Sequence, residues 1–587
     1  MDHIKKLLLS KDTTSTIESL KELDSDSGIL PTNIVKEIHT LWGDTDVGQD
    51  VYTDTELLKS YNGSEEGGIL FSCDHSILKG SKLFLKELLL NPIKDINILE
   101  RRQSVIKKVA NQDPSKLLKE MAECEPDMLW MLDNAKKTDE LSTLYNMVFF
   151  NNMLTSQLNR RGEILTGYNL YRIVGSPLIG LLTPIVYFII PYLVVRIRLK
   201  INIGFIDYLK MMFNGMFNAK STMLSSFPKL SILSTAFSLI FYFQGIFNTI
   251  EVSKASYQIS SFVVSKMNSV VRYVKLGEDL IKKFWLQDMK SAFFIGEKDY
   301  QVHDEFVNVP NARGFTMFSN FGLQLKHYKF FKRERYLNLL RHTYIIDAIS
   351  SISKLGFCYP TYLSNKDKPL VKVNGLWHPS LTNPVLNNLT LDKNFLITGP
   401  NAGGKSTLIK STLLAILFSQ TFGVANCKSI SMTPFFYINS QMNIPDCKGK
   451  ESLFEAEMYR SKANLDKLKD LDQRLSIIFM DEIFNSTNPV EGIAGAYAIA
   501  KHMASYSSNL SVITTHYLYL TKLAKELPDK FVNMKMNVNI KNQEISYPYK
   551  ISPGFSRQYI ALELLKKNGF DPDVVEDAIA IKSRLCG

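Results

Sequence analysis

A glycine-rich stretch in the C-terminal third constrains the fold more than any other feature of this chain. Residues 396–408 read LITGPNAGGKSTL, and Gly399, Gly404, Lys405 and Ser406 have the spacing G-x-x-x-x-G-K-[ST]. Apolar residues precede this stretch at strand length and follow it at helical spacing. Glycines let backbone N–H groups surround a phosphate, and the helix N-terminus adds a positive dipole end. The sequence therefore predicts a strand, a phosphate-binding loop and a helix in succession.

The loop motif assigns chemical roles to its polar residues. Lys405 is expected to reach the β- and γ-phosphates of a nucleotide, and the Ser406 hydroxyl is expected to bind Mg²⁺. A chance glycine-rich turn is the alternative interpretation. The predicted nucleotide-binding residues of the loop are Gly399, Pro400, Asn401, Ala402, Gly403, Gly404, Lys405, Ser406 and Thr407.

Two later apolar runs supply the groups that hydrolysis needs. Residues 475–480 (LSIIFM) end at Asp481 and Glu482, and residues 510–515 (LSVITT) end at His516. Asp481 is predicted to hold Mg²⁺ in the same coordination shell as Ser406. Glu482 is predicted to act as general base, and His516 to sense the γ-phosphate. Solvated acids at a strand end and a structural histidine are the alternatives. The predicted catalytic residues are Lys405, Glu482 and His516, and the predicted metal-binding residues are Ser406 and Asp481.

Four segments in this order and spacing, TGPNAGGKST, SLFEAEM, MDEI and TTHY, resemble the ATPase domain of the MutS family of DNA mismatch-repair proteins, which belongs to the ABC class. Residues 373–391 resemble the family's lead-in to this domain. Residues 345–360 resemble its connecting stretch, and residues 80–105 its opening core helices. The resemblance implies that ATP is the nucleotide and is hydrolysed. It also implies an α/β P-loop ABC-type ATPase domain at the C-terminus, preceded by an α-helical MutS-like core and lever.

A serine downstream of the loop points to a dimer. Ser452 and Glu455 form an S-x-x-E capping box, which predicts the start of a helix. In the family, the matching serine contacts the γ-phosphate of the opposing subunit, so the resemblance implies that Ser452 binds nucleotide in trans. A homodimer through the ATPase domains follows. An ordinary N-cap that serves only its own helix is the alternative.

Two uncharged apolar segments, residues 173–195 and 230–250, interrupt the resemblance. As helices they are long enough to cross the hydrocarbon core of a membrane. They predict a two-helix transmembrane hairpin at 173–250, where the family inserts a DNA-gripping clamp between two lever helices. Those lever helices are expected at 142–165 and 257–286. Two buried helices of a soluble core, or a re-entrant hairpin with its basic loop on the starting side, are the alternatives.

Other family features are absent from the sequence. About 80 residues precede the resembling core, which is too few for the family's mismatch-reading and connector domains, and the reading motif Phe-x-Glu does not occur. The loop at 483–492 reads IFNSTNPVEG, where the family has Gly-Arg-Gly-Thr-Ser-Thr. This variant is similar to membrane-associated MutS relatives in bacteria. It puts the coupling between the two sites of a dimer in doubt.

Charge and cysteine content leave the partner open. The net charge of +11 suits DNA or an anionic membrane surface, although a lysine-rich composition also gives this charge without either partner. The basic, aromatic stretch HYKFFKRERY at 327–336 is typical of nucleic-acid surfaces, with a solvated helix face as the alternative. The six cysteines form no C-x-x-C pair, so we expect reduced thiols and neither a zinc site nor a disulfide framework.

The sequence thus predicts a MutS-family ATPase with mismatch-repair kinship, in which hydrolysis at a dimer interface moves a helical core and double-stranded DNA is a candidate partner. The alternative is a membrane-anchored, ATP-driven switch that acts on a protein or membrane partner without mismatch recognition. We expect a membrane protein whose soluble domains face the cytoplasm, with a soluble intracellular protein as the alternative. The expected parts are an N-terminal segment (1–70), a first core part (71–172), the transmembrane hairpin (173–250), a second core part (251–370) and the ATPase domain (371–587).

Overall fold

The computed structural model describes residues 43–134, 148–217, 228–284, 287–293, 321–330, 333–364, 368–442, 453–541, 544–556 and 569–586. The chain forms two compact units. One contains residues 1–36, 119–279 and 300–340, and the other contains residues 37–118, 280–299 and 341–587. We call them the helical unit and the sheet unit, and each is described by itself.

A seven-stranded sheet forms the centre of the sheet unit, in the order β1-β7-β8-β9-β5-β10-β13. Every neighbouring pair is parallel except β10 with β13. The middle strands are buried along their length, as the apolar runs in the sequence predict for strands covered on both faces. The bounds are β1 Asp46–Val47, β5 Asn394–Thr398, β7 Tyr437–Gln441, β8 Ser476–Asp481, β9 Asn509–Thr515, β10 Phe531–Met536 and β13 Ile551–Pro553.

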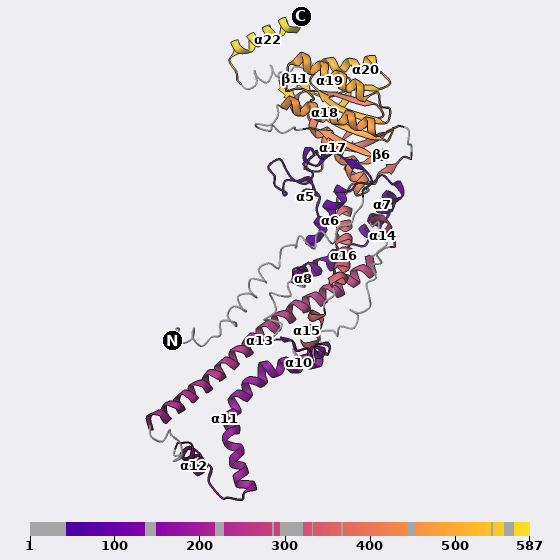
Figure 1. Cartoon of the computed structure of the whole chain (residues 1–587). Helices are drawn as coiled ribbons and strands as arrows, with labels where there is room; N and C mark the ends of the chain where they lie inside the picture. The colour runs from indigo at the N-terminus through magenta and orange to yellow at the C-terminus, as the bar shows by residue number, and fades with distance from the viewer. Residues whose placement is uncertain are drawn as a thin grey trace. The chain divides into compact units, whose positions relative to one another are not determined.

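Helices cover this sheet (Figure 1). Side chains of α18, α19 and α20 join strand residues such as Leu396, Ile478 and Ile513 in one hydrophobic core. Most residues of α17 are buried, so this helix contacts the sheet and its other neighbours around its whole circumference. The bounds are α17 Lys405–Thr421, α18 Leu453–Asp470, α19 Pro489–Met503 and α20 Leu523–Glu526.

Smaller elements complete the sheet unit. A four-stranded sheet has the order β2-β6-β3-β4, and β11 pairs with β12 as a short hairpin. Helices α6 and α7 lie within residues 79–110, where the sequence resembles the opening core helices. The bounds are β2 Thr361–Tyr362, β3 Val371–Leu376, β4 Asn387–Leu391, β6 Ser429–Met432, β11 Asn539–Lys541, β12 Glu544–Ser546, α4 Val51–Asp54, α5 Ile69–Cys73, α6 Lys79–Leu90, α7 Ile96–Ala110, α14 Gln287–Phe293 and α22 Pro572–Cys586, with short 3-10 helices η6 Asn401–Gly403 and η7 Leu518–Lys522.

The helical unit contains residues 228–279 of one long helix, α13 (Figure 1). Helix α10 packs on α15, where the Gly322 N–H donates to the Thr166 hydroxyl at 3.0 Å and a Cβ at Gly322 would collide with the Gly162 carbonyl. The elements that lie wholly or partly in this unit are α8 Ser115–Asn134, η1 Ser156–Arg160, α10 Gly162–Leu170, η2 Tyr171–Gly175, α11 Ser176–Leu193, η3 Val194–Arg198, α12 Phe205–Phe217, α13 Pro228–Phe284, α15 Phe321–Lys329 and α16 Arg333–Ser353.

The predicted lever helices differ in outcome. Helix α13 contains the described part of the expected returning helix at 257–286. The expected outgoing helix at 142–165 is not continuous over its described part, because residues 149–161 leave the α-helical conformation and include the 3-10 helix η1, whereas residues 162–165 belong to helix α10. The side chain of Asn159 explains this local structure, since it exchanges hydrogen bonds with the backbone of Phe150 and so closes a loop.

The two apolar segments differ from membrane-spanning helices in length and continuity. No single helix of the described residues has the length and hydropathy that crossing requires. One pair of helical segments, Gly162–Thr183 and Phe188–Arg198, meets the same test together, with a bend of 54° between them. The expected second span at 230–250 is the first part of α13, which continues to Phe284. The structure therefore does not support the predicted two-helix transmembrane hairpin at 173–250.

Candidate functional site

Three neighbouring parallel strands bring the predicted site residues to one edge of the main sheet. Strands β8 and β5 both pair with β9, and the register places Thr398 opposite Thr515 and Asp481 opposite Thr514. The carboxyl ends of these strands therefore meet. Ligands of open α/β sheets bind at such an edge. The glycine-rich loop follows β5, Glu482 follows β8 and His516 follows β9.

The glycine-rich loop turns directly into helix α17, as its sequence predicts. Gly404 occupies the N-cap position in the left-handed region, with φ 87°. A Cβ atom here would also lie 3.1 Å from the Tyr549 ring. Glycine is the residue that adopts this conformation without steric cost. The turn leaves Lys405 as the first residue of the helix, and its side chain is 1% exposed.

Lys405, Glu482 and His516, the three predicted catalytic residues, lie in mutual contact. The Lys405 ammonium forms a 3.0 Å ion pair with Glu482 Oε1 and lies 3.1 Å from His516 Nε2. His516 Nε2 is also 2.7 Å from Glu482 Oε1. The ammonium donates further hydrogen bonds to the carbonyl oxygens of Gly399 and Pro400. The structure thus brings together residues that are up to 111 positions apart in the chain.

These contacts determine the protonation of Glu482. Burial acts to raise the pKa of this carboxyl, but the hydrogen bond from His516 and the charge of Lys405 outweigh it and lower the pKa to about 2. Glu482 is therefore ionised at neutral pH. Its other carboxylate oxygen accepts a hydrogen bond from Asn485 Nδ2 at 2.9 Å. A carboxylate held from both sides in this way is positioned as a base, provided that Lys405 is drawn away from it.

The backbone after β8 is strained where the site is built. Glu482 and Phe484 have φ values of 54° and 61°, in a region that non-glycine residues seldom adopt. The Glu482 N–H donates to the carbonyl and the hydroxyl of Thr514, at 3.2 and 3.1 Å. The Phe484 carbonyl accepts from the Tyr517 hydroxyl at 2.7 Å. Hydrogen bonds from the next strand thus hold the Glu482 turn in a conformation that costs about 1–3 kcal/mol per strained residue.

The residues predicted to bind a metal line one cavity of about 340 Å³. Ser406, Asp481 and Glu482 border it together with Asn401. The Thr514 hydroxyl donates a hydrogen bond to Asp481 and fixes the orientation of its carboxylate. A hydroxyl and a carboxylate beside a phosphate loop are the oxygen donors that Mg²⁺ prefers, with phosphate and water completing its shell. These residues therefore fit Mg²⁺ in the presence of a nucleotide.

The same cavity is bordered by two polar residues that the sequence reasoning missed. Gln441 Nε2 donates to the Glu457 carbonyl, and the Ser461 hydroxyl donates to Gln441 Oε1, both at 3.1 Å. The Glu457 side chain is 7% exposed, and its Oε2 has no hydrogen-bond partner within the described part of the chain. Burial raises the pKa of Glu457. The polar carboxyl end of β7, Asn439 to Gln441, was the available signal for Gln441, since this end lies on the same sheet edge.

Helix α18 begins at Leu453, next to the position that the capping box indicates. Ser452 itself lies outside the described residues, so its predicted contact with the opposing subunit stays a prediction. The other predicted nucleotide-binding residues all lie in the loop or the first turn of α17.

A second cavity, of about 360 Å³, borders the end of the glycine-rich loop and the first turns of α17. It is lined by Gly404 and Thr407 of the loop and helix, and by Trp377, His378 and Tyr549 from distant segments. Burial lowers the pKa of His378 to about 4, so this imidazole is neutral at pH 7. Aromatic and neutral side chains beside a phosphate loop suit the flat base of a nucleotide. Sequence reasoning missed Tyr549 because no local pattern links it to a loop 145 residues earlier.

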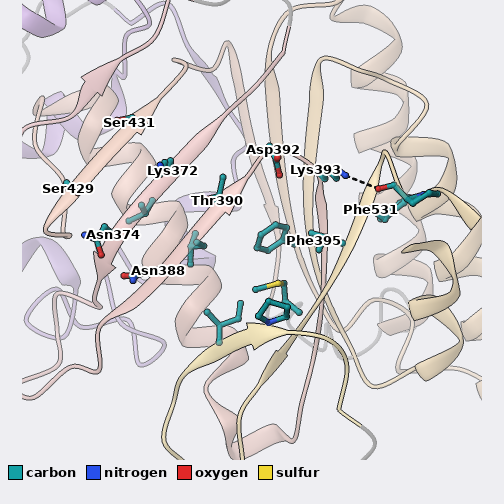
Figure 2. Close-up of a pocket in the computed structure, with 17 residues that line it drawn as sticks. Lys372, Asn374, Asn388, Thr390, Asp392, Lys393, Phe395, Ser429, Ser431 and Phe531 are labelled. Atoms are coloured by element: carbon teal, nitrogen blue, oxygen red, sulfur yellow. Dashed lines mark hydrogen bonds between the residues drawn. The ribbon is translucent and has the colours of Figure 1, made fainter. Parts of the chain in front are cut away.

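A third cavity, of about 890 Å³, is lined by strands of both the four-stranded sheet and the main sheet (Figure 2). Polar side chains of β3, β4 and β6, such as Lys372 and Asn388, form one wall, and Phe395 and Phe531 contribute from β5 and β10. None of the predicted site residues lines it. The phosphate loop follows the carboxyl end of β5, whereas this cavity includes residues at its amino end.

The strand, loop and helix arrangement agrees with the comparison to known families. Residues 395–586 match the family model of MutS domain V, a range that begins in β5 and ends in α22. It contains all the predicted catalytic, nucleotide-binding and metal-binding residues. This match supports the kinship of the C-terminal part of the chain with the MutS family of DNA mismatch-repair proteins.

Proposed function

We propose that this protein is an ATPase that binds Mg²⁺ and ATP at the carboxyl edge of its main sheet and hydrolyses the nucleotide there. The observation that carries the proposal is the direct contact of Lys405, Glu482 and His516 beside the cavity that Ser406 and Asp481 line. The kinship with MutS domain V supports the same activity.

The geometry suggests a role for each of these side chains in nucleotide binding and hydrolysis. Mg²⁺, when bound by Ser406 and Asp481, neutralises charge on the phosphate oxygens. The nucleotide competes with Glu482 for Lys405, because both are anions that pair with the same ammonium. Transfer of Lys405 to the phosphates frees Glu482 Oε1 to accept a proton from the attacking water. Asn485 holds Oε2, and His516 remains in contact with Oε1 as a group that faces the terminal phosphate.

Measurement of phosphate release tests this function. We expect Glu482→Gln to bind ATP but to hydrolyse it roughly 10²–10⁴-fold more slowly, as the loss of a general base requires. Glu65→Gln is the matched control, since Glu65 is an exposed acid between α4 and α5 and its replacement is expected to leave the rate unchanged. Near-normal turnover in Glu482→Gln would remove Glu482 from the base role. A purified wild type that releases no phosphate with Mg²⁺, with or without duplex DNA, would overturn the ATPase proposal.

We further propose that the ATPase acts as a homodimer and moves the helical unit on double-stranded DNA. The net charge of +11 and the family kinship support DNA as the partner. Binding to a fluorescent duplex should weaken steeply with salt, because contacts to phosphates release counterions. Binding that is absent at low salt would favour a partner other than DNA.

A specific observation favours a second candidate, in which the helical unit attaches the protein to a membrane and its soluble domains face the cytoplasm. Several large apolar side chains of α11 are about half exposed, including Leu178 (51%), Ile179 (55%) and Ile190 (52%). Arg196 and Arg198 follow them, and cations at this position suit anionic headgroups. Exposed apolar surface of this kind marks protein or membrane contacts.

Sedimentation with anionic phospholipid vesicles tests the membrane candidate. The double variant Ile179→Lys, Leu182→Lys should lose vesicle binding, since each lysine at the centre of an inserted helix costs roughly 2.5–3.5 kcal/mol. Both side chains are exposed, so their replacement should leave the fold intact. Leu381→Lys is the control, because Leu381 is equally exposed but lies in the sheet unit. A wild-type protein that stays in the supernatant with vesicles would exclude this candidate.

A further inference from the structure

Two cysteines that are 69 positions apart in the sequence lie in contact in the sheet unit. The sulfur atoms of Cys358 and Cys427 are 3.2 Å apart. Their backbones are held together independently of the sulfurs, because the Cys358 N–H donates to the Ala425 carbonyl and the Ala425 N–H returns the bond to Cys358. The Cys427 N–H also donates to the Ala425 carbonyl, which turns Cys427 toward Cys358. The backbone therefore presents the two thiols to each other.

The two thiols differ in environment. Cys427 is 1% exposed, whereas Cys358 is partly accessible to solvent. The hydrogen bond from the Cys427 thiol lowers the pKa of Cys358, while the same contact and burial raise the pKa of Cys427. The accessible thiol is thus also the one that ionises more readily, and the thiolate is the reactive form of cysteine. This asymmetry suits one cysteine that reacts first and a second that resolves the product.

We propose that Cys358 and Cys427 form a reversible disulfide when the protein meets a peroxide. The Cys358 thiolate attacks one oxygen of the peroxide, the O–O bond breaks, and a sulfenic acid and a hydroxide form. The Cys427 thiol then attacks the sulfenic sulfur, and its proton leaves with the departing hydroxyl as water. The hydroxide of the first step takes up the proton that Cys358 lost on ionisation, so the two sulfurs are oxidised and hydrogen peroxide is reduced to two molecules of water. A dithiol reductant reverses the reaction by thiol–disulfide exchange.

The cysteine pair is connected to the cavity that we assign to the nucleotide base. Asn426, between Ala425 and Cys427, donates hydrogen bonds to the carbonyls of Trp377 and Ser411, and both residues line the 360 Å³ cavity. Phe357, next to Cys358, packs edge-on against the Trp377 ring at 6.0 Å between centroids. A disulfide requires the sulfurs to approach to about 2.05 Å. This movement shifts the residues that support Trp377, so oxidation should weaken nucleotide binding. That consequence, unlike the disulfide itself, rests on the proposed function.

Peptide mapping of the intact, full-length protein tests the disulfide without any reference to nucleotide. The protein is treated with hydrogen peroxide, alkylated and digested without reductant. We expect one cross-linked peptide pair that contains Cys358 and Cys427, and its disappearance after treatment with dithiothreitol. Cys358→Ser should abolish the cross-link, whereas Cys124→Ser, which removes a buried cysteine of the helical unit, should leave it. Alkylation of both thiols after peroxide treatment, or cross-links only between other cysteines, would overturn the proposal.

Nucleotide binding to the oxidised and reduced protein supplies the second measurement. We expect the dissociation constant of a fluorescent ATP analogue to rise several-fold on oxidation in the wild type and to stay constant in Cys358→Ser. A cross-link without any change in nucleotide affinity would support the disulfide between Cys358 and Cys427. It would overturn the proposal that the disulfide acts on the nucleotide cavity through Trp377. Absence of nucleotide binding in the reduced wild type would instead contradict the proposed function, and the cross-link result would stand by itself.

Discussion

At the scale of single residues, the ion pair between Lys405 and Glu482 is the most consequential contact of the site. The ammonium is almost fully buried, so it needs a carboxylate, carbonyl or phosphate oxygen at every stage. Without a nucleotide, Glu482 fills this role. Glu482, the proposed general base, is therefore paired with the lysine that is expected to bind the phosphates. When ATP binds, Lys405 exchanges the Glu482 carboxylate for the phosphates, and the same step frees the base.

The pH dependence of stability reports on this ion pair. The pKa of Glu482 falls from its ordinary value of 4.5 to about 2 in the folded protein. A lowered carboxyl pKa stabilises the folded state above about pH 4.5, and this contribution is lost as the pH falls toward 2. Glu482→Gln should therefore melt at a lower temperature than the wild type at pH 5–7, and the difference in Tm should narrow below pH 4.5. Glu65→Gln, which removes an exposed acid outside any helix, should match the wild type at neutral pH. A difference that widens on acidification would contradict the ion pair.

At the scale of elements, the junction between the glycine-rich loop and α17 depends on Gly404. Its φ of 87° is costly for other residues, and a Cβ would press on the Tyr549 ring. We expect Gly404→Ala to lower the free energy of unfolding by about 1–3 kcal/mol and to weaken nucleotide binding at least tenfold. Gly245→Ala is the control, because Gly245 lies within helix α13 and a Cβ there meets no atom within 4 Å. Denaturant unfolding and nucleotide titration measure both effects, and unchanged affinity in Gly404→Ala would show that the loop tolerates a different turn.

The sequence predicted those elements that have a strong local signal. The apolar runs at β5, β8 and β9 and the spacing of the glycine-rich loop fixed both the elements and the edge where Lys405, Glu482 and His516 meet. Contacts between distant segments left no such signal. The strand β1 is two residues long and shows no periodicity, yet it pairs with β7 and extends the main sheet. Residues 149–161 have helical composition, but the Asn159 side chain closes a loop there.

Ion pairs from β1 and from the segment that follows it stabilise the pairing of β1 with β7, which the sequence did not predict. Asp50 forms an ion pair with Arg460 at 2.9 Å, and Asp46 with Lys467 at 2.6 Å, so helix α18 is attached to the N-terminal segment. Asp54 is buried between them and accepts hydrogen bonds from the Ser440 hydroxyl and the Met442 N–H. The two donors lie on either side of Gln441, the last residue of β7. Residues 46–54 therefore support the end of β7, which borders the 340 Å³ cavity that Ser406 and Asp481 line.

Asp54 makes this support sensitive to pH. Burial raises its pKa from 3.8 to about 6, and the hydrogen bonds from Ser440 and Met442 only partly oppose the shift. A carboxyl with a raised pKa stabilises the folded state below pH 3.8, and the contribution is lost as the pH rises through 6. Relative to Asp54→Asn, the wild type should lose roughly 2–3 kcal/mol of stability between pH 4 and pH 7. Asp50→Asn is the control for the loss of one carboxylate from this cluster, because Asp50 is a partly buried neighbour that also pairs with Arg460. A stability difference that does not change with pH would show that Asp54 titrates normally.

At the scale of the whole molecule, the central prediction is that two chains build each nucleotide site. The resemblance implies that Ser452 contacts the nucleotide of the opposing chain, and Lys405 serves the nucleotide of its own chain. Lys405→Ala and Ser452→Ala should each be inactive alone. In a mixed dimer, the Lys405→Ala chain contributes an intact Ser452 to the intact loop of its partner, so one site works and the other lacks both groups.

Random exchange of subunits sets the expected size of the rescue. An equal mixture of the two variants contains about one half mixed dimers, and each has one working site of two, so activity should recover to about one quarter of the wild type. The mixture of Lys405→Ala with Glu482→Gln is the control. Both of these changes affect a chain's own site, so every site in that mixture lacks one group and the activity should stay at its background value. Subunit exchange can be verified with two differently labelled chains. Verified exchange without recovery would mean that Ser452 serves only as the N-cap of its own helix, and that each chain hydrolyses ATP with its own residues.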